Sequence, residues 1–132
     1  PICDLDNTTY LDMINHYKKV ILNDDLFIEI DELINHLYTE KTELTFCHND
    51  LTKSNILFKK SFSFLDWEYA CLNDPYFDIA TVISSLNLNE EEISSFLTGY
   101  DSTKLNLNRV KEFIKLTELT EKIWNQAVKT LS

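Results

Sequence analysis

Three polar side chains in the middle of the chain have the types and spacing that metal-assisted phosphoryl transfer requires. Asp50 follows a short apolar segment, and Asn55 comes five residues later. Asp66 follows a second apolar segment. A carboxylate beside a substrate hydroxyl can orient that hydroxyl or accept its proton during attack on a phosphate. An amide oxygen and a second carboxylate suit Mg²⁺, which takes few protein ligands and keeps several of its waters.

Each of these residues also has a simpler structural explanation. A single loop aspartate is usually a turn former, so the case for chemistry depends on Asp50 and Asn55 together. We expect the chain to double back before Asp66, so that Asp66 and Asn55 lie close enough to bind the same metal ions. We assign His48 to the same catalytic loop, with a scaffolding role more than a basic one, because an imidazole can hydrogen-bond to the backbone and hold the loop.

Apolar periodicity predicts the elements that must position this loop. Amphipathic stretches indicate two helices before the loop and three after it, and short apolar runs indicate strands around it. The helix that starts near Pro75 is apolar almost all round, so we expect it to be buried. The order predicts a mainly helical α+β fold with a small β hairpin insert that carries the catalytic loop. The expected helices lie at about 8–22, 23–38, 75–86, 89–99 and 107–131, and the expected strands at 44–47, 55–58 and 62–66.

Composition and charge exclude several classes of protein. The 132 residues are 44% hydrophobic and 12% aromatic, which predicts one globular domain over residues 1–132. The net charge of −10 argues against binding to nucleic acids and to anionic membranes. No apolar run approaches the roughly 20 residues that span a bilayer. An acidic surface suits a cationic substrate, although a solvated surface explains the charge as well.

Other potential metal ligands have ordinary structural explanations. The glutamates at 90–92 follow Asn89, and capping together with the helix dipole explains them better than a metal cluster does. The 3 cysteines are widely spaced and form no CxxC pair, which argues against structural zinc or a disulfide framework. Unpaired cysteines favour a reducing compartment, so we expect a cytoplasmic protein.

The central motifs resemble a known family of kinases. The segment 48–55, with His48, Asp50 and Asn55, resembles the HxDxxxxN catalytic loop of the protein-kinase-like fold. Its HND form is typical of the choline/ethanolamine kinase and aminoglycoside phosphotransferase group. LDWEYA at 65–70 and NDPYFDIA at 73–80 are similar to the stretch that follows this loop in bacterial choline kinases. The flanking helices match the C-terminal lobe of that family in order and length.

The resemblance implies a role for each motif residue. Asp50 would be the catalytic base, and Asn55 and Asp66 would bind the Mg²⁺ that accompanies ATP, the phosphate donor. Glu68 would lie near the metal or the substrate. Asp78 would be structural and would tie its helix to the catalytic loop. The sequence supports this role independently, because a carboxylate in an apolar helix needs hydrogen-bond partners.

The substrate that the resemblance implies is choline or a similar amino alcohol. Aromatic faces bind a quaternary ammonium by cation–π attraction, and choline kinases typically carry two Trp three residues apart on the last helix. Here Trp124 stands at the first position, but Ala127 stands at the second. The candidates for substrate contact are therefore Glu68, Trp124, Tyr69, Tyr76 and Tyr100. Ethanolamine, thiamine and aminoglycosides stay open as alternative substrates.

The nucleotide-binding half of such a kinase has no counterpart in the sequence. The chain contains 1 glycine, which cannot form a Gly-rich phosphate loop, and no strand lysine of the VAIK type precedes His48. We therefore expect a C-terminal lobe that needs an N-terminal lobe in the same protein, is inactive alone, and exposes apolar surface that favours self-association. The alternative from another functional class is a truncated interaction module without catalysis.

Overall fold

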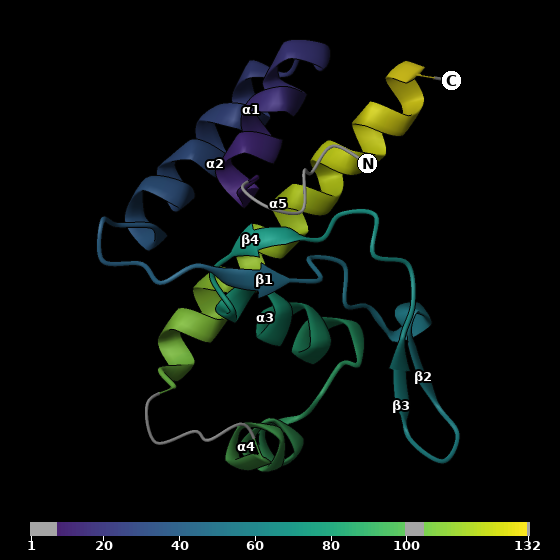
Figure 1. Cartoon of the computed structure of the whole chain (residues 1–132). Coiled ribbons are helices and arrows are strands. Elements are labelled where there is room, and N and C mark those ends of the chain that lie inside the picture. The colour runs from purple at the N-terminus through teal and green to yellow at the C-terminus, as the bar shows by residue number, and fades with distance from the viewer. Residues whose placement is uncertain (1–7, 100–104, 132) are drawn as a thin grey trace.

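Helices and two small pairs of antiparallel strands make up the chain in the computed structural model, which describes residues 8–99 and 105–131 (Figure 1). The expected mainly helical α+β fold is confirmed. The helices are α1 (Tyr10–Val20), α2 (Asp24–Leu37), α3 (Tyr76–Ser85), α4 (Glu90–Gly99) and α5 (Leu107–Leu131), and the strands are β1 (Thr45–Cys47), β2 (Ile56–Phe58), β3 (Phe62–Phe64) and β4 (Cys71–Asn73).

Side-chain caps explain where several helices begin. Thr9 and Asp12 exchange hydrogen bonds at the start of α1, and the Asn23 side chain accepts from a backbone N–H in α2. At α4 the Asn89 side chain accepts from the Glu92 N–H at 2.8 Å, and the Glu92 carboxylate accepts from the Asn89 N–H at 3.1 Å. The glutamates at 90–92 therefore belong to a helix start, as the sequence indicates.

The long helix α5 is the element around which the other helices pack. It contacts α1, α2 and α3, and it crosses behind the β1–β4 pair in Figure 1. None of the helices in the described ranges is both long and apolar enough to cross a membrane. The helix α3 is buried along most of its length, as its composition predicts. The side chains with the least exposure include Tyr10, Met13, Ile30, Leu37, Phe77, Phe113, Leu116 and Ile123.

The two strand pairs stand on either side of the catalytic loop. In the first, β1 pairs with β4, and Cys47 lies opposite Cys71 as a free thiol. Burial raises the pKa of Cys47 to about 12, so this thiol stays protonated at neutral pH. In the second, β2 and β3 form the expected hairpin, which projects from the lobe (Figure 1). The loop runs from the end of β1 into β2 and so joins the two pairs.

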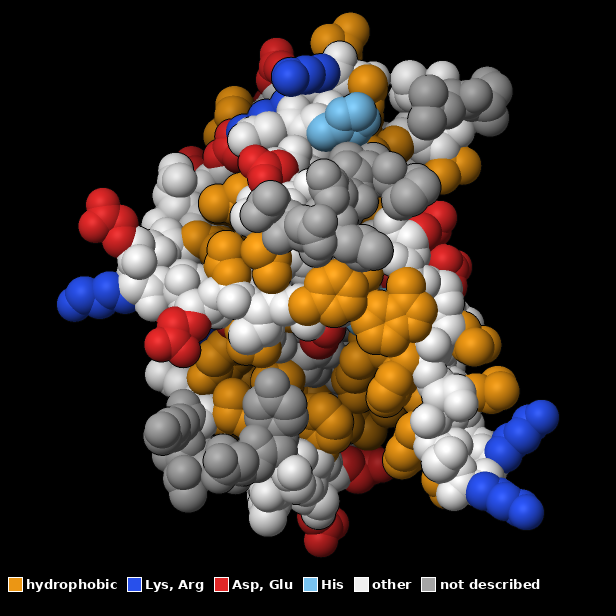
Figure 2. Space-filling view, viewed as in Figure 1, with side chains coloured by type: hydrophobic (Ala, Val, Ile, Leu, Met, Phe, Trp, Pro, Cys, Tyr) orange, Lys and Arg blue, Asp and Glu red, His pale blue; other side chains and the backbone are white. Residues whose placement is uncertain are grey.

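Aromatic side chains on the strands and on the loop after β3 are left exposed to solvent. Phe58 and Phe62 in the hairpin are each 65% exposed, and Trp67 is 47% exposed and stacks on Phe46 at 6.0 Å between ring centroids. Figure 2 shows hydrophobic side chains gathered between β1 and the hairpin. The described residues thus leave apolar side chains exposed on this face.

Arg109 joins α5 to two other parts of the fold. Its guanidinium donates to the Asp74 carboxylate at 2.6 Å and to the Leu37 carbonyl at 3.2 Å. It also lies 5.0 Å from the ring centroids of Tyr76 and Phe113. Because Asp74 is buried, loss of the arginine would leave an uncompensated charge inside the protein.

We therefore expect Arg109→Met to lower the free energy of unfolding by about 3 kcal/mol. A matched control is Lys115→Met on the same helix, because Lys115 and Glu29 are 3.9 Å apart and both are exposed. That change should cost less than about 0.5 kcal/mol. Urea denaturation measures both values, and equal losses in the two variants would contradict the role of Arg109.

Candidate active site

A carboxylate at the start of α3 holds the catalytic loop. Asp78 accepts the His48 backbone N–H at 2.9 Å and the Asn49 backbone N–H at 2.8 Å. Burial raises the pKa of Asp78, and these two bonds oppose that rise. The contact is the one that the sequence predicts for Asp78, and it sets the path of the chain just before Asp50.

Asn49 anchors the loop on its inner side, a role that the sequence analysis did not assign. It is 1% exposed and has a backbone φ of 69°, a left-handed conformation that Asn tolerates better than most residues. Its side-chain NH₂ donates to the Tyr69 carbonyl at 2.8 Å, and its carbonyl accepts from the Asn73 side chain at 2.9 Å. Asn73 in turn accepts from the Tyr38 hydroxyl. The only sequence signal was a polar residue between His48 and Asp50.

His48 positions the loop through both ring nitrogens. Nδ1 accepts the Asp50 backbone N–H at 3.1 Å, so Nε2 carries the hydrogen that it donates to the Leu65 carbonyl at 2.7 Å. The ring also packs against Trp67, with 4.7 Å between centroids. Both ring nitrogens thus have partners within the protein, which suits the scaffolding role expected for His48 better than that of a proton acceptor.

Asn55 fixes the orientation of Asp50. Its side-chain NH₂ donates to the Asp50 carbonyl at 2.8 Å and to the Asp50 carboxylate at 3.1 Å. No hydrogen bond from a residue in the described ranges reaches the amide oxygen of Asn55. That oxygen is therefore available to a metal ion, and one carboxylate oxygen of Asp50 is available to a substrate.

The end of the hairpin brings Asp66 toward the same region. The Leu65 N–H donates to the Asn55 carbonyl at 2.8 Å, and Asp66 follows with φ of 58° and an exposed side chain. Within residues 8–99 and 105–131, no three His, Cys, Asp or Glu side chains gather closely enough to bind a metal by themselves. An ion bound by Asn55 and Asp66 would need further ligands, such as phosphate oxygens and water.

The local charge at Asp50 suits a cation. Its pKa is raised to about 6, mainly by burial and further by the charges of Asp66 and Glu68, while His48 and Asn55 oppose the rise. None of the ion pairs between described residues includes Asp50, Asp66 or Glu68. A divalent cation beside Asn55 and Asp66 would offset this unbalanced negative charge, so the residues present fit Mg²⁺.

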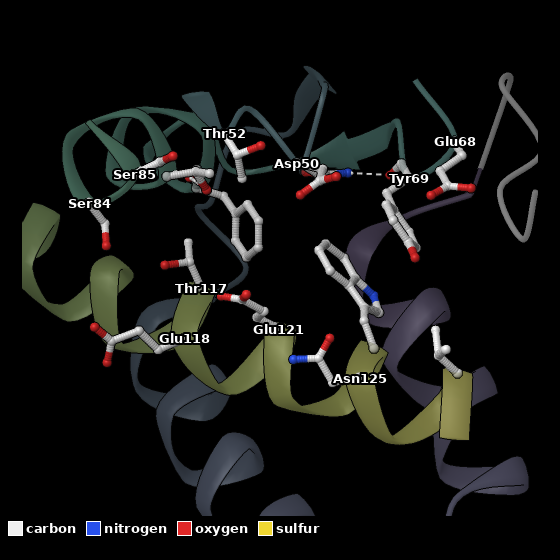
Figure 3. A pocket seen from close by; sticks show the side chains of 15 residues that line it. Asp50, Thr52, Glu68, Tyr69, Ser84, Ser85, Thr117, Glu118, Glu121 and Asn125 are labelled. Carbon is white, nitrogen blue, oxygen red and sulfur yellow. Dashed lines mark hydrogen bonds between the residues drawn. The ribbon is translucent and has the colours of Figure 1, made fainter. Parts of the chain in front are cut away.

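A cavity of about 490 Å³ opens beside Asp50. The loop residues Asp50 and Thr52 form one wall, and Glu118, Glu121 and Asn125 on α5 project from the opposite wall (Figure 3). Together with Glu68 the cavity has four carboxylates, and its lining includes no Lys, Arg or His. These α5 residues were not predicted from the sequence, although their three- and four-residue spacing indicates one face of a helix.

Only some of the aromatic residues that were predicted to contact the substrate line this cavity. Tyr69 and Trp124 line it and stack on each other with 4.0 Å between centroids. Tyr76, also predicted to contact the substrate, does not line it. Its ring packs against Phe113, and its hydroxyl accepts the Asn106 N–H at 2.9 Å, so Tyr76 supports the core. Tyr100 lies outside the described residues.

Comparison with known proteins gives consistent results. The model of the family described as choline/ethanolamine kinase matches residues 5–126. Protein LicA of Haemophilus influenzae is 33% identical over 99 residues, which cover 67% of this chain and 37% of that protein. The crystal structure of choline kinase LicA from Streptococcus pneumoniae matches 90% of this chain and 46% of its own, with a TM-score of 0.76 and 21% identity. A structure of LicA in complex with AMP matches with a TM-score of 0.74 and 21% identity, over 90% of this chain and 45% of its own. The chain thus spans less than half the length of each of these proteins.

The pKa of Asp50 predicts a pH dependence of stability. The unfolded carboxyl has its ordinary pKa of 3.8 and the folded one about 6, so the native state binds the proton more tightly. The resulting stabilisation is complete below pH 3.8 and is lost as the pH rises through about 6. The difference in unfolding free energy between the natural chain and Asp50→Asn, measured in urea, should therefore decrease over this range. A difference that does not vary with pH would contradict the raised pKa.

Proposed function

Because the chain belongs to the choline/ethanolamine kinase family, we propose that it forms the substrate-binding part of an ATP-dependent kinase. That kinase would phosphorylate the hydroxyl group of a small amino alcohol. The observation that supports this most directly is the setting of Asp50. Its carboxylate lies at the edge of an acidic cavity, held by Asn55, and its backbone N–H is held by His48. Such a carboxylate can accept a hydrogen bond from a substrate hydroxyl in the cavity.

In the proposed reaction Asp50 orients the substrate hydroxyl and accepts its proton. With a pKa of about 6, this carboxylate is mostly ionised at neutral pH and still basic enough to bind a proton. The hydroxyl oxygen bonds to the γ-phosphorus of ATP, and the bond from that phosphorus to the bridging oxygen of ADP breaks. Asn55 and Asp66 would hold Mg²⁺, which neutralises charge on the phosphate oxygens.

The charge of the cavity lining favours a cationic substrate. Four carboxylates and no basic side chain line it, so it attracts positive charge and repels anions. The motifs at 65–70 and 73–80 favour choline, and ethanolamine differs from choline only in lacking the three methyl groups on nitrogen. Thiamine and aminoglycosides are weaker candidates because nothing in these motifs favours them. The retention of Asp50, Asn55 and Asp66 speaks against an interaction module without catalysis.

We further propose that another lobe of the same protein supplies the nucleotide-binding half. The chain has 1 glycine, so a Gly-rich loop over the phosphates must come from elsewhere. The exposed rings of Phe46 and Trp67 lie beside the catalytic loop and form a surface that such a lobe could cover. Residues 1–132 would then be a single C-terminal lobe, in a cytoplasmic enzyme with access to ATP.

The chain alone should therefore show no measurable ATP turnover with choline or ethanolamine. A longer protein that begins upstream of Pro1 and contains a nucleotide-binding lobe should convert both ATP and the alcohol. Coupled detection of ADP release with Mg²⁺ present measures this in both proteins. Turnover by the 132-residue chain would refute the need for a second lobe.

In that longer protein, Asp50→Ala should lower kcat by roughly 10²–10⁴-fold, because the substrate hydroxyl loses its proton acceptor. The KM for ATP should change little, since Asp50 is not proposed to bind the nucleotide. Glu91→Gln is a matched control, because Glu91 is exposed on α4 and does not line the cavity. Wild-type turnover in the Asp50 variant would remove Asp50 from its proposed role.

A further inference from the structure

The aromatic rings at the cavity are poorly arranged for a quaternary ammonium. Such a group has no N–H to donate, so proteins hold it mainly against exposed aromatic faces. Tyr69 and Trp124 are stacked at 4.0 Å with 14° between their planes, so one face of each ring is covered by the other. Trp124 is only 9% exposed. The position three residues further on is occupied by Ala127, which has no ring to offer.

The acidic wall of the cavity has the opposite character. Glu118 and Glu121 are one helical turn apart on α5 and both line the cavity, with the Glu118 carboxylate on the side of Ser84 (Figure 3). Neither carboxylate makes a hydrogen bond or an ion pair with a side chain in the described ranges. Ionised carboxylates only accept hydrogen bonds, and their bonds to an ammonium N–H are short and strong.

One hydrogen-bond donor on the lining of this cavity has no partner among the described residues. Nε1 of Trp124 is buried and has no hydrogen-bond partner among the described residues. An unpaired polar atom of this kind is costly unless water or a ligand satisfies it. Trp124 lines the same cavity as Glu118 and Glu121, so the lining offers one unpaired donor together with carboxylate acceptors.

We propose that Glu118 and Glu121 recognise the substrate nitrogen through N–H···O hydrogen bonds, and that the site therefore prefers alkanolamines that carry N–H groups over quaternary choline. This inference rests on the proposed function, because Asp50 is taken to mark the hydroxyl end of the substrate. Each methyl group on nitrogen removes one donor and adds bulk between nitrogen and carboxylate. A site built to hydrogen-bond an N–H rejects an analogue that lacks it.

A methylation series tests this preference without any phosphoryl transfer. Ethanolamine, N-methylethanolamine, N,N-dimethylethanolamine and choline are titrated into the 132-residue chain by calorimetry at neutral pH. Affinity should decrease along the series, with ethanolamine at least about tenfold tighter than choline. Tighter binding of choline, equal binding of all four, or no binding of any at millimolar concentration would overturn the proposal.

Substitutions then identify the groups responsible. Glu118→Gln combined with Glu121→Gln removes both charges with little change of shape. This double variant should bind ethanolamine about tenfold more weakly, and the four alkanolamines should then differ less in affinity. Glu91→Gln removes one exposed charge away from the cavity and should leave the series unchanged. An unaltered series in the double variant would also overturn the proposal. Because binding is measured without ATP, a failed kinase assay would refute the proposed function without changing this result.

Discussion

The carboxylate of Asp78 is the contact on which the catalytic loop depends. A loop that leaves a strand only three residues long has few backbone bonds of its own, and its N–H groups need partners elsewhere. Asp78 accepts two successive N–H groups from a rigid, buried helix, and this fixes the peptides on both sides of His48. Asn49 can then hold a left-handed turn that presents Asp50 to the cavity.

The helix α5 serves the core and the site with different faces. Phe113, Leu116 and Ile123 pack inward, while Glu118 and Glu121 lie on the wall of the cavity. A rigid helix holds side chains more accurately than a loop does, which suits recognition of a small molecule. The two roles also separate energetically, because exposed glutamates can change with little effect on the packed face.

Much of the fold could be predicted from local signals, and the failures have physical causes. The bounds of α5 and the cap of α4 follow from apolar periodicity and from Asn89, which act within a few residues. Strand β4 was missed because its three residues show no alternation, and it forms only by pairing with β1. The packing of Tyr76 on the core could not be predicted, because its partners, Arg109 and Phe113, lie more than 30 positions away in the sequence. The α5 wall of the cavity was missed for the same reason, since only tertiary packing brings it opposite Asp50.

The position of Trp67 ties the outer surface to the chemistry. One aromatic neighbour is Phe46 on the exposed patch, and the other is His48, whose ring nitrogen holds the Asp50 backbone. Trp67 thus packs between the exposed patch and the side chain that positions the Asp50 backbone. A substitution at Trp67 would therefore change the packing around His48 as well as the exposed surface.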